Sequence, residues 1–133
     1  MTGDYTPLLP ALSRMHVRQF VLEYATPRAG DIGVVGRALS GVVPGTEGLA
    51  GGGLPREIGL GVVNPRTTEA ETPQFIVGKA EAALEYYRPE QMFLNTDCGF
   101  GCFANRCVNV EEVAAAKLRS IVAAARILRE RHG

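Results

Sequence analysis

The stretch Met92–Cys107, MFLNTDCGFGCFANRC, joins a short apolar run to the densest set of reactive side chains in the chain. The run Met92–Leu94 is bounded by polar residues, which is typical of a strand covered on both faces, as in a parallel sheet. Cys98 follows this strand, and Gly99 and Gly101 allow the backbone to turn sharply there. The pattern therefore predicts a thiol in a loop at the C-terminal end of a strand, where α/β proteins carry their chemistry.

The composition indicates one globular domain over residues 1–133. The chain has 133 residues, of which 46% are hydrophobic, and its 14 basic and 14 acidic residues cancel. No net field favours nucleic acid or an anionic membrane, no apolar run approaches the ~20 residues of a membrane span, and the N-terminus lacks signal-peptide features. We therefore expect a cytoplasmic protein with reduced cysteines and with neither nucleic-acid nor membrane partners.

The elements expected along the chain alternate between helices and strands. They are a helix over Tyr5–Met15, a strand over Val17–Tyr24, a brief helix over Arg28–Val35, a strand over Ile58–Val63, a helix from Pro73 to about Tyr87 capped by Thr72, the strand at Met92, and a helix over Val110–Arg131 capped by Asn109. This order predicts an α/β fold of about three parallel strands with right-handed crossovers. Because three parallel strands are few, we expect part of a larger sheet or barrel.

The positions of the glycines predict a flexible loop and a point of close contact on a strand. Residues 36–55 hold seven glycines and two prolines and read as a flexible loop. A phosphate cradle at Gly51–Gly53 lacks the strand before it and the helix after it that such a loop needs. Gly59 and Gly61 alternate along a strand, which predicts close approach of another group.

The final helix is amphipathic, and its apolar face is expected to pack on the sheet. The predicted face is made of Val113, Leu118, Ile121, Ala125 and Leu128.

Polar side chains follow each predicted strand where it ends. The candidates are Glu23 after the first strand, Asn64 and Arg66 after the second, and Asn95, Asp97 and Cys98 at the third. Because the C-terminal ends of parallel strands lie at one edge of the sheet, these groups are expected at a common site.

Each candidate also has a less specific interpretation. Glu23 is solvated, hydrogen-bonded or a metal ligand. Cys98 is either a small apolar residue packed under Phe100 or a ligand. Arg66 either binds a substrate carboxylate or pairs with a nearby glutamate such as Glu69 or Glu71.

Two motifs resemble a known family. The segments IGLGVVNPRT, at 58–67, and FLNTDCGFG, at 93–101, followed by a long alanine-rich helix, resemble the C-terminal end of cobalamin-independent methionine synthase and its shorter homologues. The resemblance covers the chain from about Tyr5 to Arg129. It implies the C-terminal part, roughly three-eighths, of a (β/α)8 TIM-type barrel, which is incomplete as a barrel on its own.

The resemblance also implies a zinc site. In the family, a His-x-Cys pair, a glutamate and the cysteine of an N-x-D-C-G loop hold zinc, which activates a substrate thiol for attack on the methyl group of a folate. On this sequence the cysteine corresponds to Cys98 and the glutamate to Glu23. The His-x-Cys pair would fall at or before Met1, so half of the expected ligand set is present, and catalytic residues beyond it stay unassigned.

Three positions depart from the family or lie outside its motif. Arg66 stands near the place where the full-length synthases carry a histidine. Cys102 and Cys107 form C-x3-C-x4-C with Cys98, unlike the C-x2-C spacing of structural zinc sites, and are interpreted as bystanders.

The resulting hypothesis is a C-terminal piece of a zinc-dependent enzyme that transfers a methyl group from a methylated folate to homocysteine, giving methionine. Its barrel would be completed by an N-terminal partner chain or by homo-oligomerisation. One alternative is a thiol alkyltransferase acting on another thiol, such as coenzyme M. The other is a non-catalytic remnant or assembly module with an open sheet edge.

Overall fold

The computed structural model describes residues 4–103, 106–107 and 110–133. Four α-helices and five strands are assigned in this part of the chain, besides short 3-10 turns. The helices are α1 (Leu9–Arg14), α2 (Ile32–Leu39), α3 (Pro73–Ala83) and α4 (Glu111–His132), and the strands are β1 (Gln19–Glu23), β2 (Glu57–Val63), β3 (Met92–Thr96), β4 (Gly101–Phe103) and β5 (Arg106–Cys107).

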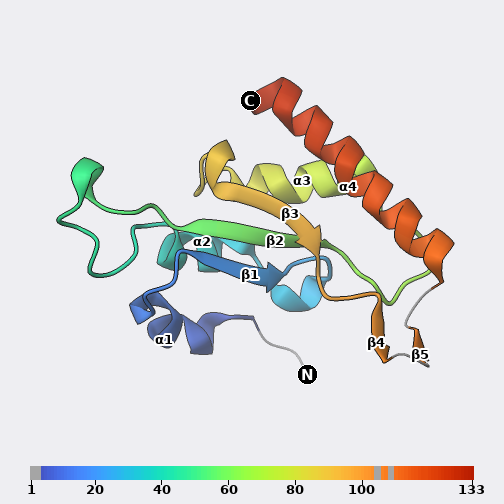
Figure 1. The fold of residues 1–133 in the computed structure, drawn as a ribbon, viewed down its shortest axis with the longest axis horizontal. Helices are drawn as coiled ribbons and strands as arrows, with labels where there is room; N and C mark the ends of the chain where they lie inside the picture. The colour runs from blue at the N-terminus through green and yellow to red at the C-terminus, as the bar shows by residue number, and fades with distance from the viewer. Residues whose placement is uncertain (1–3, 104–105, 108–109) are drawn as a thin grey trace.

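The first three strands form one parallel sheet in the order β1-β2-β3. Phe20 pairs with Ile58, and Leu60 pairs with both Leu22 and Leu94, so the apolar residues of the three strands stand in register. All three strands point the same way, which brings their C-terminal ends to one edge (Figure 1). The prediction of three parallel strands with connecting helices is confirmed.

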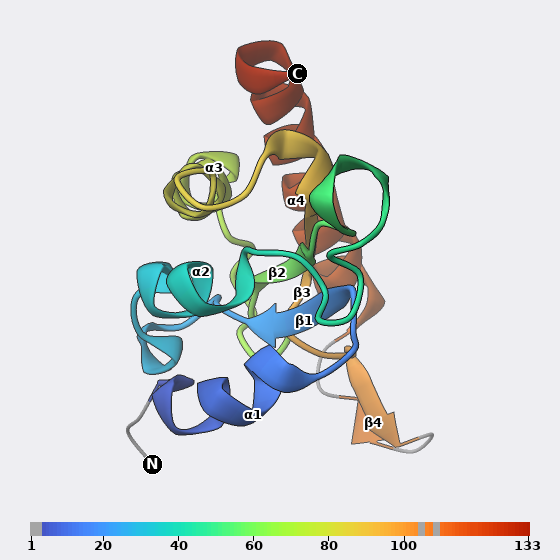
Figure 2. The ribbon, with the colours of Figure 1, turned by 90° about the vertical axis from the view of Figure 1, so that its left-hand side faces the viewer.

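Helices cover one face of this sheet. α2 lies beside α3 and α3 beside α4 (Figure 2), and the core between them and the sheet is apolar. Its fully buried members include Val35, Leu39, Ile58, Leu60, Val62, Ile76, Ala80 and Ala124.

The opposite face of the sheet is open. Successive residues of a strand point to opposite faces, so Val21 and Phe93 point away from the helices, and they are 60% and 48% exposed. A parallel sheet ordinarily has both faces covered. In the described part of the chain, the parallel sheet therefore has one face covered by helices and one open face.

The glycines of β2 allow the close contacts that their alternation predicts. A Cβ on Gly59 would lie 2.9 Å from Asn95 Oδ1 and from Val21 Cγ2, and a Cβ on Gly61 would lie 2.8 Å from Leu22 O. The neighbouring strands thus carry side chains over β2 where β2 has none.

The glycine-rich segment begins later than its composition suggests. α2 continues through Leu39, so the helix includes the first four residues of the predicted loop 36–55, and the observed loop starts at Ser40. Gly36 lies within α2 against the ring of Tyr86. A Cβ at this position would collide with that ring, so the absence of a side chain lets α2 pack closely. The rest of the loop is closed at its base by the Val43 N–H, which donates to Leu54 O at 2.9 Å. It lies at the N-terminal end of β2, and its flexibility stays a prediction.

α4 packs on the core partly as predicted, through Leu128 and Ile121, but its buried face also includes residues outside the predicted set. Lys117, Ala124 and Leu128 are buried, whereas Leu118 is 49% exposed. The predicted cap Asn109 lies outside the described residues, as do the side chains of Cys102 and Cys107. The antiparallel pair β4–β5 after Cys98 was not predicted. Among the described helices, none combines the length and apolarity needed to cross a membrane.

Candidate functional site

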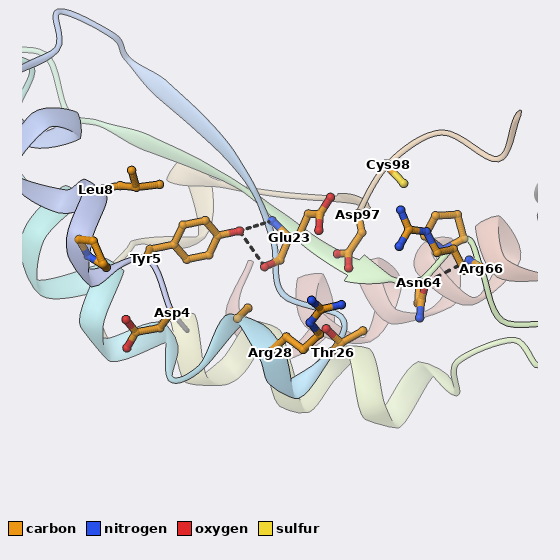
Figure 3. A pocket seen from close by; sticks show the side chains of 13 residues that line it. Asp4, Tyr5, Leu8, Glu23, Thr26, Arg28, Asn64, Arg66, Asp97 and Cys98 are labelled. Atoms are coloured by element: carbon orange, nitrogen blue, oxygen red, sulfur yellow. Dashed lines mark hydrogen bonds between the residues drawn. The ribbon is translucent and has the colours of Figure 1, made fainter. Parts of the chain in front are cut away.

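A pocket of about 810 Å³ opens at the C-terminal ends of the parallel strands. Residues from all three strand exits line it, together with the segment before α1 and the turn before α2 (Figure 3). The lining residues are Asp4, Tyr5, Pro7, Leu8, Glu23, Thr26, Arg28, Ala29, Asn64, Pro65, Arg66, Asp97 and Cys98.

The structure brings together five of the six residues that the sequence places at the site. Glu23, Asn64, Arg66, Asp97 and Cys98 all line the pocket. Asn95 does not: it lies within β3, its Nδ2 donates to Thr96 O at 2.9 Å, and its Oδ1 faces Gly59.

Asp97 joins the third strand exit to the first. Its Oδ1 accepts hydrogen bonds from the backbone N–H groups of Tyr24 and Ala25, at 3.1 and 3.2 Å. The carboxylate reaches across β2 because Gly61 has no side chain there. Burial raises the pKa of Asp97, although the two N–H donors act in the opposite direction. Asp97 therefore fixes the backbone beside Glu23 while it lines the pocket next to Cys98.

Tyr5 holds Glu23 from the open edge of β1. Its hydroxyl accepts from the Glu23 N–H at 3.0 Å and donates to Glu23 O at 3.1 Å. Burial raises the pKa of Tyr5, which keeps the hydroxyl protonated and able to do both. The sequence does not indicate this role of Tyr5, because the two residues are 18 positions apart and periodicity carries no signal for such a contact.

The loop between β2 and α3 is organised by its own polar groups. The Asn64 N–H donates to Glu71 Oε2 at 2.7 Å, and Asn64 Oδ1 accepts from the Arg66 N–H at 3.0 Å. Glu71, a suggested partner of Arg66, forms its ion pair with Lys117 at 2.9 Å. The side chain of Arg66 is exposed and lines the pocket.

The pocket carries charges of both signs. Asp4, Glu23 and Asp97 supply carboxyl groups, and Arg28 and Arg66 supply guanidinium groups. Arg28, from the turn Pro27–Ala29, was not singled out in the sequence. Guanidinium groups suit a carboxylate, and carboxylates suit an ammonium group. The lining thus offers partners for both a negatively and a positively charged group.

The donors available for a metal are few. Glu23 and Cys98 are both exposed at the pocket, and their carboxylate and thiolate are groups that zinc accepts. In the described ranges, no group of three or more His, Cys, Asp or Glu is arranged to hold a metal ion. The chemistry of the two side chains is compatible with zinc, but on their own they do not form a metal site.

The chain matches known proteins along most of its length. Residues 46–127 match the family described as "Cobalamin-independent synthase, Catalytic domain". The chain is 30% identical over 128 residues to a methionine synthase of Pyrococcus abyssi, covering 96% of this chain and 32% of that protein. It is 32% identical over 75 residues to a methionine synthase of Sulfurisphaera tokodaii, covering 56% of this chain and 20% of that protein.

A solved structure has the same fold. The B12-independent methionine synthase from Shewanella sp. W3-18-1, in complex with selenomethionine, superposes with a TM-score of 0.74 at 17% identity, over 96% of this chain and 31% of that chain. This likeness confirms the predicted fold, an open part of a TIM-type barrel. The chain spans about a third or less of the length of these relatives.

Proposed function

The chain belongs to the cobalamin-independent synthase family, through its catalytic domain, and we propose that it contributes to methyl transfer from a methylated folate to homocysteine, giving methionine. The observation that carries the proposal is the convergence of Glu23, Asp97 and Cys98 with Arg28 and Arg66 on one pocket. We place the reaction in the cytoplasm, where the cysteines stay reduced.

Zinc would be held by Glu23 and Cys98. Bound zinc supplies a Lewis acid that lowers the pKa of a coordinated thiol, so that the thiolate forms near neutral pH. Tyr5 holds the backbone of Glu23 itself, and Asp97 holds the backbone of the two residues that follow it. Because catalytic zinc sites use three protein ligands, we expect the missing donors to come from outside the described residues.

The amino-acid part of homocysteine would bind between the charged groups of the pocket. Arg66 and Arg28 suit its carboxylate, and the carboxyl groups of the lining suit its ammonium group. These contacts would orient the thiol toward Cys98 and Glu23.

We further propose that additional β/α units complete the barrel, either from the same polypeptide or from a second chain. The support is the open face with Val21 and Phe93 and the share of the relatives, about a third, that this chain spans. Added strands would pair with the outer edges of β1 and β3, and the closed barrel would remove the apolar surface of the open face from water.

Reconstitution tests the function. The chain would be co-expressed with the part of the Pyrococcus abyssi methionine synthase that it does not match. We expect a 1:1 complex that retains one zinc after dialysis and forms methionine from homocysteine and a methylated folate. For the chain alone we expect less than one zinc per chain. One tightly held zinc in the isolated chain would show that the ligand set is wrong.

Matched variants identify the ligands. Cys98→Ser and Glu23→Gln should lower zinc content and methyl transfer, while Cys102→Ser and Cys107→Ser should leave both unchanged. A second pair of variants tests assembly. Phe93→Lys on the open face should weaken the complex, whereas Leu49→Lys, at an exposed position in the glycine-rich loop, should not.

The outcomes separate the alternatives. Turnover of coenzyme M in place of homocysteine would support an alkyltransferase acting on another thiol. A complex that forms but binds no zinc would support an assembly module. If the isolated chain is a compact monomer and does not bind the co-expressed part of the Pyrococcus abyssi protein, the proposal of a completed barrel is contradicted.

A further inference from the structure

Lys117 is a buried lysine on the inward face of α4. Its side chain is 0% exposed. The ammonium group donates to Thr67 Oγ1 at 2.8 Å, to Glu69 O at 2.8 Å and to Glu71 Oε1 at 2.9 Å. A lysine ammonium has three N–H donors, so all three are used.

The three acceptors belong to one segment. Thr67, Glu69 and Glu71 lie in the loop between β2 and α3, whose first residues line the pocket. The other carboxylate oxygen of Glu71 accepts from the Asn64 N–H at 2.7 Å. Lys117 therefore connects α4 to both ends of this loop.

A buried ion pair contributes little net stability to a fold. Removing two charges from water costs free energy that their attraction only partly offsets, and apolar pairs of similar volume often stabilise as well. Such a pair does impose one geometry, because every donor and acceptor must be satisfied. The geometry here is that of the segment carrying Asn64 and Arg66.

We propose that Lys117 is a positioning residue of the pocket. With Glu71 it fixes the loop between β2 and α3 so that the guanidinium of Arg66 stands beside the thiol of Cys98. Both side chains line the pocket, and Figure 3 shows them on the same side of it. The inference rests on the proposed function in that it takes this pocket as the substrate site.

The position of the Arg66 guanidinium relative to the Cys98 thiol can be measured by comparing how fast an anionic and a neutral reagent alkylate Cys98. Iodoacetate and iodoacetamide both react with the thiolate, so the ratio of their rates cancels changes in thiol ionisation and exposure. A nearby cation favours the anionic reagent. Peptide mapping by mass spectrometry reads Cys98 separately from Cys102 and Cys107.

We expect the iodoacetate-to-iodoacetamide ratio to fall about two- to fivefold in Arg66→Gln, the effect of losing one nearby charge in a solvated site. Lys117→Met should lower the ratio to a similar extent, and the double variant Arg66→Gln/Lys117→Met should lower it no further. An unchanged ratio in Arg66→Gln would overturn the placement of Arg66 beside Cys98.

Stability is separated from positioning by two further variants. Lys117→Met/Glu71→Gln removes the uncompensated carboxylate but keeps an acceptor for the Asn64 N–H, so it should fold even if Lys117→Met does not, and its ratio should stay low. Ala124→Gly, at another buried position of α4, should reduce stability and leave the ratio at the wild-type value.

A wild-type ratio in Lys117→Met/Glu71→Gln would show that Lys117 has only a structural role. The measurement uses the chain alone, without zinc or a methyl donor. A failed methyl-transfer assay together with a lowered ratio would therefore overturn the proposed function and leave the positioning role standing.

Discussion

Replacing Asp97 with alanine and with asparagine tests the link between the first and third strand exits. Alanine removes the acceptor of the Tyr24 and Ala25 N–H groups, whereas asparagine keeps an oxygen in the same place. Both changes remove the partly buried carboxylate. The difference between the two variants therefore isolates the hydrogen bonds from the charge.

The expected size of this difference follows from the two donors. The Tyr24 N–H keeps Gly61 O as an acceptor at 3.0 Å, so its loss is small. Ala25 is buried, and Asp97 is the acceptor that the described part of the chain provides for its N–H. Leaving one buried N–H unsatisfied costs about 1–3 kcal/mol. Asp97→Ala should be less stable than Asp97→Asn by that amount.

Urea unfolding followed by circular dichroism measures the difference, which corresponds to a midpoint shift of about 0.5–2 M. The pH dependence adds a second check. Because the folded-state pKa of Asp97 is raised above 3.8, the folded form binds more protons there, and its contribution to stability falls as pH rises through and above that value. Asp97→Asn should lack this fall. Equal midpoints for the two variants, or an unchanged pH profile in Asp97→Asn, would refute the reasoning.

Two other predictions concern the sheet and the core. Gly61→Ala should destabilise the chain by about 1–3 kcal/mol, because the new Cβ would press on Asp97 and on the backbone of Leu22. Gly78→Ala should instead stabilise α3 by about 0.5–1 kcal/mol, because nothing lies within 4 Å of a Cβ at that position. Equal effects of the two substitutions in thermal melts would contradict this prediction. Burial raises the pKa of Tyr87 from 10.0 to about 12, so stability should fall by about 2–3 kcal/mol as pH rises between these values. Tyr87→Phe should lose this part of the alkaline slope in urea titrations, at a cost near neutral pH of about 1 kcal/mol for its hydrogen bond to Leu39 O.

Sequence patterns were reliable where a local rule applies. Thr72 caps α3 as predicted, because its side chain accepts from the Phe75 N–H. The helix α2 was placed too early because Gly36 was interpreted as a loop residue, whereas in the structure it makes room for Tyr86. Glycine thus occurs both in flexible loops and in helices at points of close packing, and only the packing partner distinguishes the two cases.

By itself, the sequence determined the three parallel strands and the edge that carries Glu23, Asn64, Arg66, Asp97 and Cys98. Hydrophobic periodicity sets the strands, and parallel order sends every exit to one edge.

The tertiary structure alone decided which groups hold that edge together. Tyr5 binds the backbone of Glu23 from 18 residues away, and Lys117 is buried where Leu118 was expected. Such contacts depend on the rotation of a helix and on the path of distant segments. A lysine stands inside because the loop between β2 and α3 presents three oxygens to it, and local periodicity contains no information about those oxygens.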